Sequence, residues 1–364
     1  MAHTERVLQA FEQQFGDTEG VRLFFAPGRV NLIGEHTDYN GGHVFPCAIS
    51  LGTYAAARKR NDRVMRFFSV NFEKLGVIST SLDDLTPSKQ AGWTNYPKGV
   101  VWAFAQKGHP IDCGFDMVIY GDIPNGSGLS SSASLEVLTG EMLRSFFGME
   151  DVLTNEDLAF IGQYSENEYN GMKCGIMDQF ASCFGKKDQL IRLNCKTLEY
   201  KYFPFKPKGY RLVLLDSCVK HELASSAYNK RRASCENAAA AIKKNHPEID
   251  CLSDCKRVWL DEVRGEIPEE DFIRAEYVIG EVQRVLDVCD ALERGDYVTV
   301  GEMMYQTHFG LSRLYEVSCE ELDYLNALAR KMDVTGSRVM GGGFGGCTIN
   351  LVKDELYEPF INEA

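Results

Sequence analysis

In the first third of the chain, apolar residues come in short runs separated by turn-forming residues. These runs predict β-strands at residues 24–26, 44–49, 54–58, 64–70, 76–80 and 117–120. Short strands joined by turns favour a mostly antiparallel sheet. Residues 1–15 place apolar side chains at helical spacing among Glu, Arg and Gln, which predicts an amphipathic helix and not a secretory signal.

From residue 131 onward, the apolar positions follow the 3.6-residue period of helices. Helices are predicted at residues 131–147, 155–169, 227–244 and 269–294, with strands at 190–193, 210–216 and 347–352. Helices and strands separated in this way indicate an α+β protein, without a regular βαβ series. No linker marks a domain boundary. We therefore predict two domains, at 1–180 and 181–364, with an approximate boundary.

Composition narrows the class of protein. The chain has 364 residues, 44% hydrophobic and 25% charged, which is enough for two domains with a substantial core. Its net charge of −13 argues against a nucleic-acid partner, because a phosphate backbone demands an excess of Lys and Arg. Apolar runs of membrane-spanning length are absent from the sequence, so we expect no membrane partner. Separately, we expect a cytoplasmic protein that is a monomer. The 12 cysteines form no C-x-x-C pair, which favours reduced thiols.

The most informative segment is residues 126–136, Gly-Ser-Gly-Leu-Ser-Ser-Ser-Ala-Ser-Leu-Glu. It follows a strand-like run and leads into a helical pattern, so backbone N–H groups and a helix N-terminus converge on one small volume. That arrangement suits a polyphosphate. A P-loop would need Lys after its glycines, and a dinucleotide fingerprint would need Gly or Ala where Ser131 stands. A flexible Ser/Gly linker is the alternative, although the apolar stripe that follows argues against it.

Three further segments contain candidate functional residues. Residues 28–39, Gly-Arg-Val-Asn-Leu-Ile-Gly-Glu-His-Thr-Asp-Tyr, offer the mixed donors and acceptors that a polyhydroxylated sugar needs, or else form a self-satisfied surface loop. Asp178 follows a glycine-flanked turn, with Glu166 upstream; such carboxylates serve metal binding and hydroxyl activation, although an Asp in this position also caps helices. Residues 341–346, with five glycines, form either a loop that closes over a ligand or a tight turn before the final strand.

Together, these motifs resemble the GHMP small-molecule kinase superfamily and, within it, the galactokinase family. The family's sugar-binding motif is matched throughout residues 28–39 and its phosphate loop throughout 124–134. Its third motif matches residues 341–346, and the galactokinase active-site turn matches 175–180. The four motifs occur in the family's order, and the resemblance covers residues 20 to 352. It implies a two-domain fold with the active site between the domains. The N-terminal domain would resemble the second domain of ribosomal protein S5, and the C-terminal domain would be a ferredoxin-like α/β sandwich.

The resemblance also implies an activity: ATP-dependent phosphorylation of the anomeric hydroxyl of D-galactose, giving galactose 1-phosphate and ADP, with Mg²⁺. Asp178 would accept the hydroxyl proton and Arg29 would stabilise the transferring phosphoryl group. The remaining roles fall into three groups. Substrate contacts would come from Glu35, His36, Thr37, Asp38, Gly175 and Tyr228. Nucleotide contacts would come from Ser69, Trp93, Gly126, Ser127, Gly128, Leu129, Ser130, Ser131 and Ser132, and the Mg²⁺ ligands would be Ser132 and Glu166.

Two other functions stay open at this stage. An N-acetylgalactosamine kinase or another sugar 1-kinase would share the same loops. A sugar- and ATP-binding regulator without catalysis would keep the binding loops, although the intact serine run and Asp178 favour an enzyme. The chain runs only from Gly346 to Ala364 after the third motif, which is shorter than the family pattern of a longer helix and a closing strand. We therefore expect either a truncated chain or a last sheet that lacks an edge strand.

Overall fold

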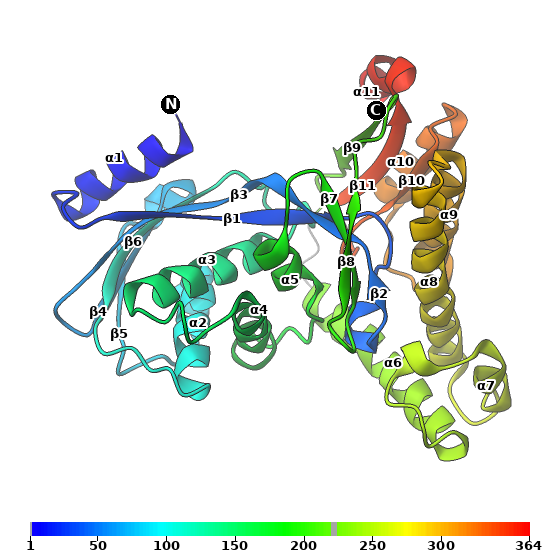
Figure 1. Ribbon diagram of the computed structural model, residues 1–364, viewed down its shortest axis with the longest axis horizontal. Helices are drawn as coiled ribbons and strands as arrows, with labels where there is room; N and C mark the ends of the chain where they lie inside the picture. Colours follow the sequence, from blue (N-terminus) through cyan, green and yellow to red (C-terminus); the bar gives the residue numbers. More distant parts are fainter. Residues whose placement is uncertain (1, 220–223) are drawn as a thin grey trace. The chain divides into compact units, whose positions relative to one another are not determined.

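The computed structural model describes residues 2–219 and 224–364 and divides the chain into two compact units (Figure 1). The first unit comprises Met1–Arg29, Ala48–Asn125 and Ser130–Gly185, and the second comprises Val30–Cys47, Gly126–Leu129 and Lys186–Ala364. The chain thus passes between the units several times, whereas the sequence analysis places a single boundary near residue 180. The pairing of strands β2 (His43–Val44) and β7 (Gln189–Asn194) explains part of this difference, because it ties the early segment to the later one.

The first unit is built on a five-stranded sheet with the strand order β1-β3-β6-β4-β5. The pairs β3–β6 and β4–β5 are antiparallel and β4–β6 is parallel, so the predicted mostly antiparallel sheet is confirmed. Its strands are β1 (Arg22–Asn31), β3 (Pro46–Lys59), β4 (Val64–Ser69), β5 (Ile78–Ser81) and β6 (Phe115–Gly121). Its helices are α1 (His3–Phe15), α2 (Asn95–Gln106), α3 (Ser131–Phe146), α4 (Asn155–Tyr164) and α5 (Met177–Phe184).

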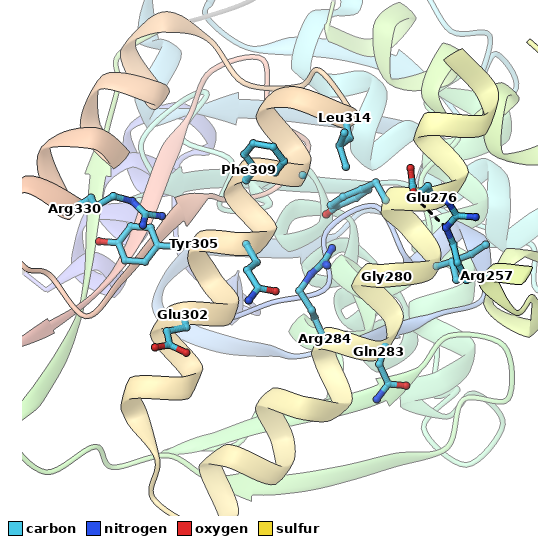
Figure 2. A pocket seen from close by; sticks show the side chains of 14 residues that line it. Arg257, Glu276, Gly280, Gln283, Arg284, Glu302, Tyr305, Phe309, Leu314 and Arg330 are labelled. Carbon is cyan, nitrogen blue, oxygen red and sulfur yellow. Dashed lines mark hydrogen bonds and ion pairs between the residues drawn. The ribbon is translucent and has the colours of Figure 1, made fainter. Parts of the chain in front are cut away.

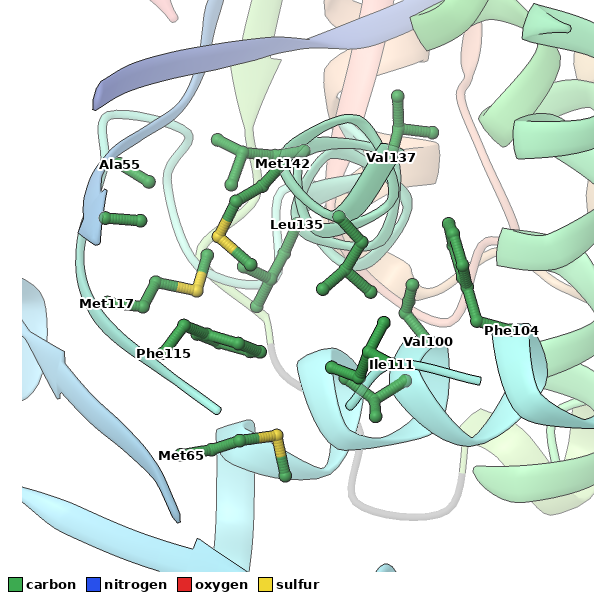
Figure 3. Packing of buried hydrophobic residues seen from close by; sticks show 14 of the residues in the cluster. Ala55, Met65, Val100, Phe104, Ile111, Phe115, Met117, Leu135, Val137 and Met142 are labelled. Carbon is green, nitrogen blue, oxygen red and sulfur yellow. The ribbon is translucent and has the colours of Figure 1, made fainter. Parts of the chain in front are cut away.

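Apolar side chains cover both faces of this sheet. Because side chains alternate along a strand, Ala55 and Ala57 of β3 join the core beneath helices α2 and α3, while Ala56 joins the cluster under α1. Figure 3 shows the larger core, in which Met117 and Phe115 of β6 lie near Leu135 and Met142 of α3. This packing fixes the start of α3, the helix that follows the predicted phosphate loop.

The second unit contains two three-stranded sheets, with the orders β2-β7-β8 and β10-β11-β9. Its remaining strands are β8 (Tyr200–Pro204), β9 (Tyr210–Asp216), β10 (Gly336–Val339) and β11 (Cys347–Lys353). Its helices are α6 (Ala224–Asn245), α7 (Arg257–Glu262), α8 (Glu269–Glu293), α9 (Tyr297–Phe309), α10 (Glu320–Lys331) and α11 (Tyr357–Glu363). Helices α8 and α9 pack side by side, and α9 and α10 both contact β10.

Some elements differ from the sequence predictions for identifiable reasons. The two strands predicted within residues 44–58 are largely one continuous strand, β3, because Gly52 does not interrupt the extended backbone. Helix α2 was not predicted, because seven of its residues are buried and it lacks the polar face that makes a helical period visible. Helix α9 was also not predicted, since its Tyr, Val and Thr residues favour strands locally.

The predicted N-terminal helix is present as α1, apart from Met1, which lies outside the described residues. The predicted strand before the C-terminus is β11, and the short helix α11 follows it. Among the described helices, none has both the length and the apolar composition needed to cross a lipid bilayer.

Candidate active site

In the first unit, Asp178 is held by two donors at the start of α5. Arg29 donates from Nε to Asp178 Oδ1 at 2.9 Å, and Ser130 donates from Oγ to Asp178 Oδ2 at 2.6 Å. The Arg29 side chain is only 4% exposed, whereas that of Asp178 is 30% exposed. Gly175 is buried in the turn that leads into α5. A carboxylate fixed on both oxygens and still partly open to solvent is well placed to receive a proton from a ligand hydroxyl.

Ser130 itself adopts the left-handed conformation, with φ of 62°. This conformation costs a non-glycine residue about 1 kcal/mol and persists where the surroundings fix it. Here Ser130 is the residue just before α3, and its hydroxyl reaches Asp178. The phosphate loop and the active-site turn, which lie far apart in the sequence, therefore meet at this side chain.

A pair of buried carboxyl groups lies beside Asp178. Ser132 donates a hydrogen bond to Glu166, which contacts Glu136 of α3, and burial raises the pKa of both glutamates. Glu136 Oε2 accepts from Gln179 Nε2 at 2.9 Å, while its Oε1 is buried and has no hydrogen-bond partner. Two carboxyl groups buried in contact with each other suit a divalent metal ion, which would neutralise them.

The described residues contain no group of three or more His, Cys, Asp or Glu side chains arranged as a metal cage. Mg²⁺ in kinases does not need such a cage, because it takes one or two protein ligands and completes its shell with phosphate oxygens and water. Ser132 and Glu166 supply one hydroxyl and one carboxylate in contact with each other. The donor set thus fits Mg²⁺ as the sequence analysis expects.

Four of the predicted nucleotide-contacting residues line one small cavity in the first unit: Ser69, Trp93, Ser131 and Ser132. Its volume is about 180 Å³, less than a site for a whole drug-sized ligand usually occupies. Ser69 Oγ and Trp93 Nε1 are both buried there without a hydrogen-bond partner. Two orphaned donors at an apolar cavity could bind a flat group that carries acceptors.

In the second unit, the first four residues of the phosphate loop, Gly126, Ser127, Gly128 and Leu129, pack against the third glycine-rich segment. A Cβ atom on Gly341 would lie 3.0 Å from the carbonyl oxygen of Gly128, and one on Gly346 would lie 3.1 Å from that of Ser127. Both glycines also have positive φ values, 77° and 81°. The glycines at 341–346 are thus explained by close contact between two backbone loops. Five glycines in six residues predict a close backbone approach or positive φ, and both are present here, although the partner loop was not predicted.

The sugar-motif loop of the second unit is anchored by a fully buried ion pair. Arg338 of β10 donates to Glu35 Oε1 at 2.9 Å, and the Gly341 N–H donates to the same oxygen at 2.9 Å. Arg338 also donates to the carbonyl oxygens of Leu32 and Asn31. Glu35 is 1% exposed and Arg338 is 0% exposed. One arginine therefore ties the sugar motif to the strand that precedes the third motif.

The four consecutive residues 35–38 differ in accessibility. Thr37 is fully buried, and its hydroxyl bonds only to the backbone carbonyls of Gly34 and His43, at 2.9 and 2.7 Å. The Thr37 side chain thus stabilises the loop, and its contact with the sugar stays a prediction. Asp38 is the one of the four that is partly exposed.

His36 belongs to a chain of hydrogen bonds among aromatic side chains. Its Nε2 lies 3.2 Å from the carbonyl oxygen of Gly342, which can only accept, so Nε2 carries the proton. In the neutral ring, Nδ1 then accepts from the Tyr39 hydroxyl at 2.8 Å, and Tyr39 accepts from Tyr315 at 2.7 Å. The Tyr228 ring lies 5.2 Å from the His36 ring. Burial lowers the pKa of His36 to about 3, so this cluster is neutral at pH 7.

These buried histidines predict a pH dependence of stability. Burial also lowers the pKa of His308, in α9, to about 4. The unfolded chain binds a proton at each histidine near pH 6.5 and the folded chain does not. The contribution of each is therefore complete above pH 6.5 and is lost as the pH falls towards the folded pKa. For His308 the loss between pH 7 and pH 5 is about 2 kcal/mol.

The test compares urea unfolding of the wild type and His308→Gln at pH 7 and pH 5. We expect the pH-dependent change in unfolding free energy to be smaller in the variant by about 2 kcal/mol. Taking the difference between the wild type and the variant cancels the contributions of the other titrating groups. Equal pH dependence in the two proteins would contradict a neutral buried His308.

Several residues of the site were not found from the sequence. Arg338 and Tyr315 reach the sugar motif through contacts that no local pattern encodes. Glu136 could have been found, because it stands four residues after Ser132 and so shares its helix face. A charged residue in the middle of an apolar helix stripe is itself a signal of function.

Comparisons with known proteins bear on this site. A family model described as the galactokinase galactose-binding signature matches residues 9–59, which include the sugar motif. Models of the GHMP kinase N-terminal and C-terminal domains match residues 95–186 and 289–360. The galactokinase of Bacillus subtilis is 46% identical over 363 residues, covering 99% of this chain and 92% of the relative. The chain belongs to the galactokinase family.

Further comparisons agree with membership of the galactokinase family. The galactokinase of Clostridium acetobutylicum is 46% identical over 93% of this chain and 87% of its own. A crystal structure of Lactococcus lactis galactokinase complexed with galactose matches with a TM-score of 0.93 and 39% identity, covering 98% of this chain and 92% of that one. The predicted two-domain GHMP kinase fold is thereby confirmed, as is the prediction of a kinase, and family membership implies the use of ATP.

Proposed function

We propose that this galactokinase-family enzyme transfers the γ-phosphoryl group of ATP to the anomeric hydroxyl of D-galactose, giving galactose 1-phosphate and ADP. The observation that carries the proposal is Asp178, bonded to Arg29 and Ser130 and still partly exposed. The relatives are galactokinases, and the Lactococcus lactis protein was crystallised with galactose. We propose that the protein acts in the cytoplasm as a monomer.

In the proposed reaction, the Asp178 carboxylate accepts the proton of the anomeric hydroxyl as the sugar oxygen attacks the γ-phosphorus. The bond from that phosphorus to the bridging oxygen breaks, and ADP leaves with the electron pair. Arg29 has two tasks: it orients Asp178 through its Nε, and its buried charge stabilises the negative charge of the transferring group. Positioning and charge carry most of the rate in such a loose transition state.

The sugar would be held by Glu35, His36, Asp38 and Tyr228, with Gly175 at the turn before α5. The hydrogen bonds of the neutral His36 ring to Tyr39 and to the Gly342 carbonyl oxygen fix its orientation in the sugar motif. The loop Gly126 to Ser132 would hold the phosphates at the start of α3, and the cavity with Ser69 and Trp93 would take part of the nucleotide. Ser132 and Glu166 would hold Mg²⁺, which would neutralise phosphate charge when bound.

A Glu166→Gln variant tests the metal assignment. Since the amide carries no charge, we expect the Mg²⁺ concentration for half-maximal activity to rise about tenfold or more. Isothermal titration of Mg²⁺ in the presence of ADP gives a second readout that does not depend on turnover. Glu168→Gln is the matched control, because Glu168 lies two residues away and forms an exposed ion pair with Lys173. Equal Mg²⁺ affinity in the Glu166 and Glu168 variants would refute the assignment.

The substrate is tested by ADP release with Mg-ATP and a panel of galactose, N-acetylgalactosamine, glucose, arabinose and mevalonate. The proposal predicts turnover with galactose far above that with the others. Comparable or higher turnover with N-acetylgalactosamine would move the assignment to another sugar 1-kinase. Failure of folded protein to turn over any sugar would favour a binding regulator.

A further inference from the structure

A cavity of the second unit lies between helices α8 and α9, and nothing in the proposed reaction uses it. Its volume is about 900 Å³, and its lining is mainly apolar. Figure 2 shows Arg284 of α8 reaching into this space, while the Tyr305 ring of α9 lies beside Arg330; Phe309, Tyr305 and Arg284 all line the cavity. Phe309 is 61% exposed, which is unusual for a phenylalanine and leaves its ring free to contact a ligand.

Arginines outnumber glutamates around this cavity. Three arginines line it, Arg257, Arg284 and Arg330, against two glutamates, in a chain whose net charge is −13. Arg257 forms ion pairs with Glu276 and Asp261. Arg330 lies over the Tyr305 ring at 4.1 Å and forms no salt bridge among the described residues. Arg284 uses only Nε in its ion pair with Glu281, which leaves its two terminal nitrogens as donors.

Arg284 is also linked to the sugar motif. Its Nε donates to Glu281 Oε2 at 2.7 Å, and Glu281 is 0% exposed. Glu281 Oε1 accepts at 2.9 Å from the backbone N–H of Gly34, which immediately precedes Glu35. Thr307 of α9 donates to the same carboxylate at 2.8 Å. A single buried carboxylate therefore connects the cavity to the loop that carries the sugar motif.

A second connection runs through Tyr277, which lines the same cavity. Its hydroxyl donates to the carbonyl oxygen of Glu35 at 3.1 Å, and its ring lies 4.9 Å from that of Tyr315. Tyr315 in turn bonds to Tyr39, the partner of His36. Two independent chains of contacts thus join this cavity to adjacent residues of one loop.

From this arrangement we propose that the cavity between α8 and α9 binds a small organic anion, a carboxylate or phosphate carried on an apolar body, and that its occupancy weakens sugar binding. The apolar body packs on Phe309 and Tyr305, and the anionic group accepts from the terminal nitrogens of Arg284. Charge-assisted bonds from arginine to a carboxylate or phosphate are among the strongest available to such a site.

The direction of the coupling follows from competition for Arg284. An anion that draws the guanidinium towards itself weakens its bond to Glu281. The carboxylate keeps its donors Gly34 and Thr307 but loses its counter-charge, which is costly for a buried group. The conformation of the sugar-motif loop in which the Gly34 N–H donates to Glu281 then becomes less favourable. By thermodynamic linkage, bound galactose must lower the affinity for the anion by the same factor. This coupling rests on the proposed function, whereas anion binding alone does not.

Binding is tested first, without turnover, by saturation-transfer NMR titration of the full chain. Benzoate and phenyl phosphate are the probes; benzyl alcohol lacks the charge, and inorganic phosphate lacks the apolar body. We expect at least one organic anion to bind about tenfold more tightly than both controls, and the better probe shows which anionic group the site prefers. Phe309→Ala and Arg330→Gln should each weaken that binding several-fold. Tyr324→Ala is the matched control, because Tyr324 is 65% exposed and lies outside the cavity.

The coupling is then tested by repeating the titration with and without galactose and by measuring the galactose KM with the better anion. The proposal predicts weaker anion binding with galactose and a higher KM at unchanged kcat. The proposed site would be refuted if neither organic anion bound. It would also be refuted if neither Phe309→Ala nor Arg330→Gln changed the affinity for the anion. Anion binding that galactose leaves unchanged would overturn the coupling. If the protein phosphorylated no sugar, the NMR result would still decide the site.

Discussion

Replacing Asp178 with asparagine should lower kcat for galactose by about 10³-fold while leaving the protein folded. The amide has the shape of the carboxylate and still accepts from Arg29, so the turn before α5 should keep its structure. What it cannot do is take the proton of the sugar hydroxyl. The change should fall on kcat and leave the galactose KM within a few-fold, because the lost interaction belongs to the transition state.

Steady-state ADP release and a thermal unfolding scan of the same preparation provide the measurement. Ser130→Ala is the matched control, since it removes the other donor to Asp178 and keeps the carboxylate. We expect its kcat to fall by about tenfold, roughly the effect of one lost hydrogen bond to a charged group. A folded Asp178→Asn enzyme with kcat within threefold of the wild type would contradict the assignment of Asp178 as proton acceptor.

Replacing Arg338 with methionine should have the largest effect on stability. Methionine fills a similar space but leaves Glu35 buried without its ion-pair partner, which costs about 3–5 kcal/mol. The loss also frees the backbone carbonyls of Asn31 and Leu32, so the sugar motif should loosen. We expect a lower urea midpoint and, in the protein that remains folded, a raised galactose KM.

Two comparisons separate this effect from a general loss of charge. Arg211→Met removes an exposed ion pair with Asp354 and should cost less than about 1 kcal/mol. The double variant Glu35→Gln/Arg338→Met should be more stable than Arg338→Met alone, because the uncompensated charge is gone. Similar urea midpoints for Arg338→Met and Arg211→Met would show that the buried pair does not anchor the sugar motif.

The sequence was sufficient to predict the family and the two-domain fold, while its assignment of residues to the chemistry stays a prediction. Its motifs are local, and each places Asp178, Ser132 or Glu35 on a turn or helix start whose form depends on nearby residues. The residues that hold them in place could not be predicted. Arg338 meets Glu35 across 303 positions and Glu281 meets Gly34 across 247, and no periodicity carries such a pairing. The loop-stabilising bond of Thr37 could not be predicted for a similar reason, since its hydroxyl bonds to His43 only in the folded loop.

In the proposed reaction, this enzyme phosphorylates galactose at its anomeric oxygen. The most direct test is a coupled ³¹P and ¹H NMR spectrum of the product formed from galactose and Mg-ATP. We expect one new sugar phosphate whose phosphorus is scalar-coupled to the anomeric proton, formed together with an equal amount of ADP. A phosphate coupled to any other sugar proton, or ADP formed with free inorganic phosphate and no sugar phosphate, would contradict it.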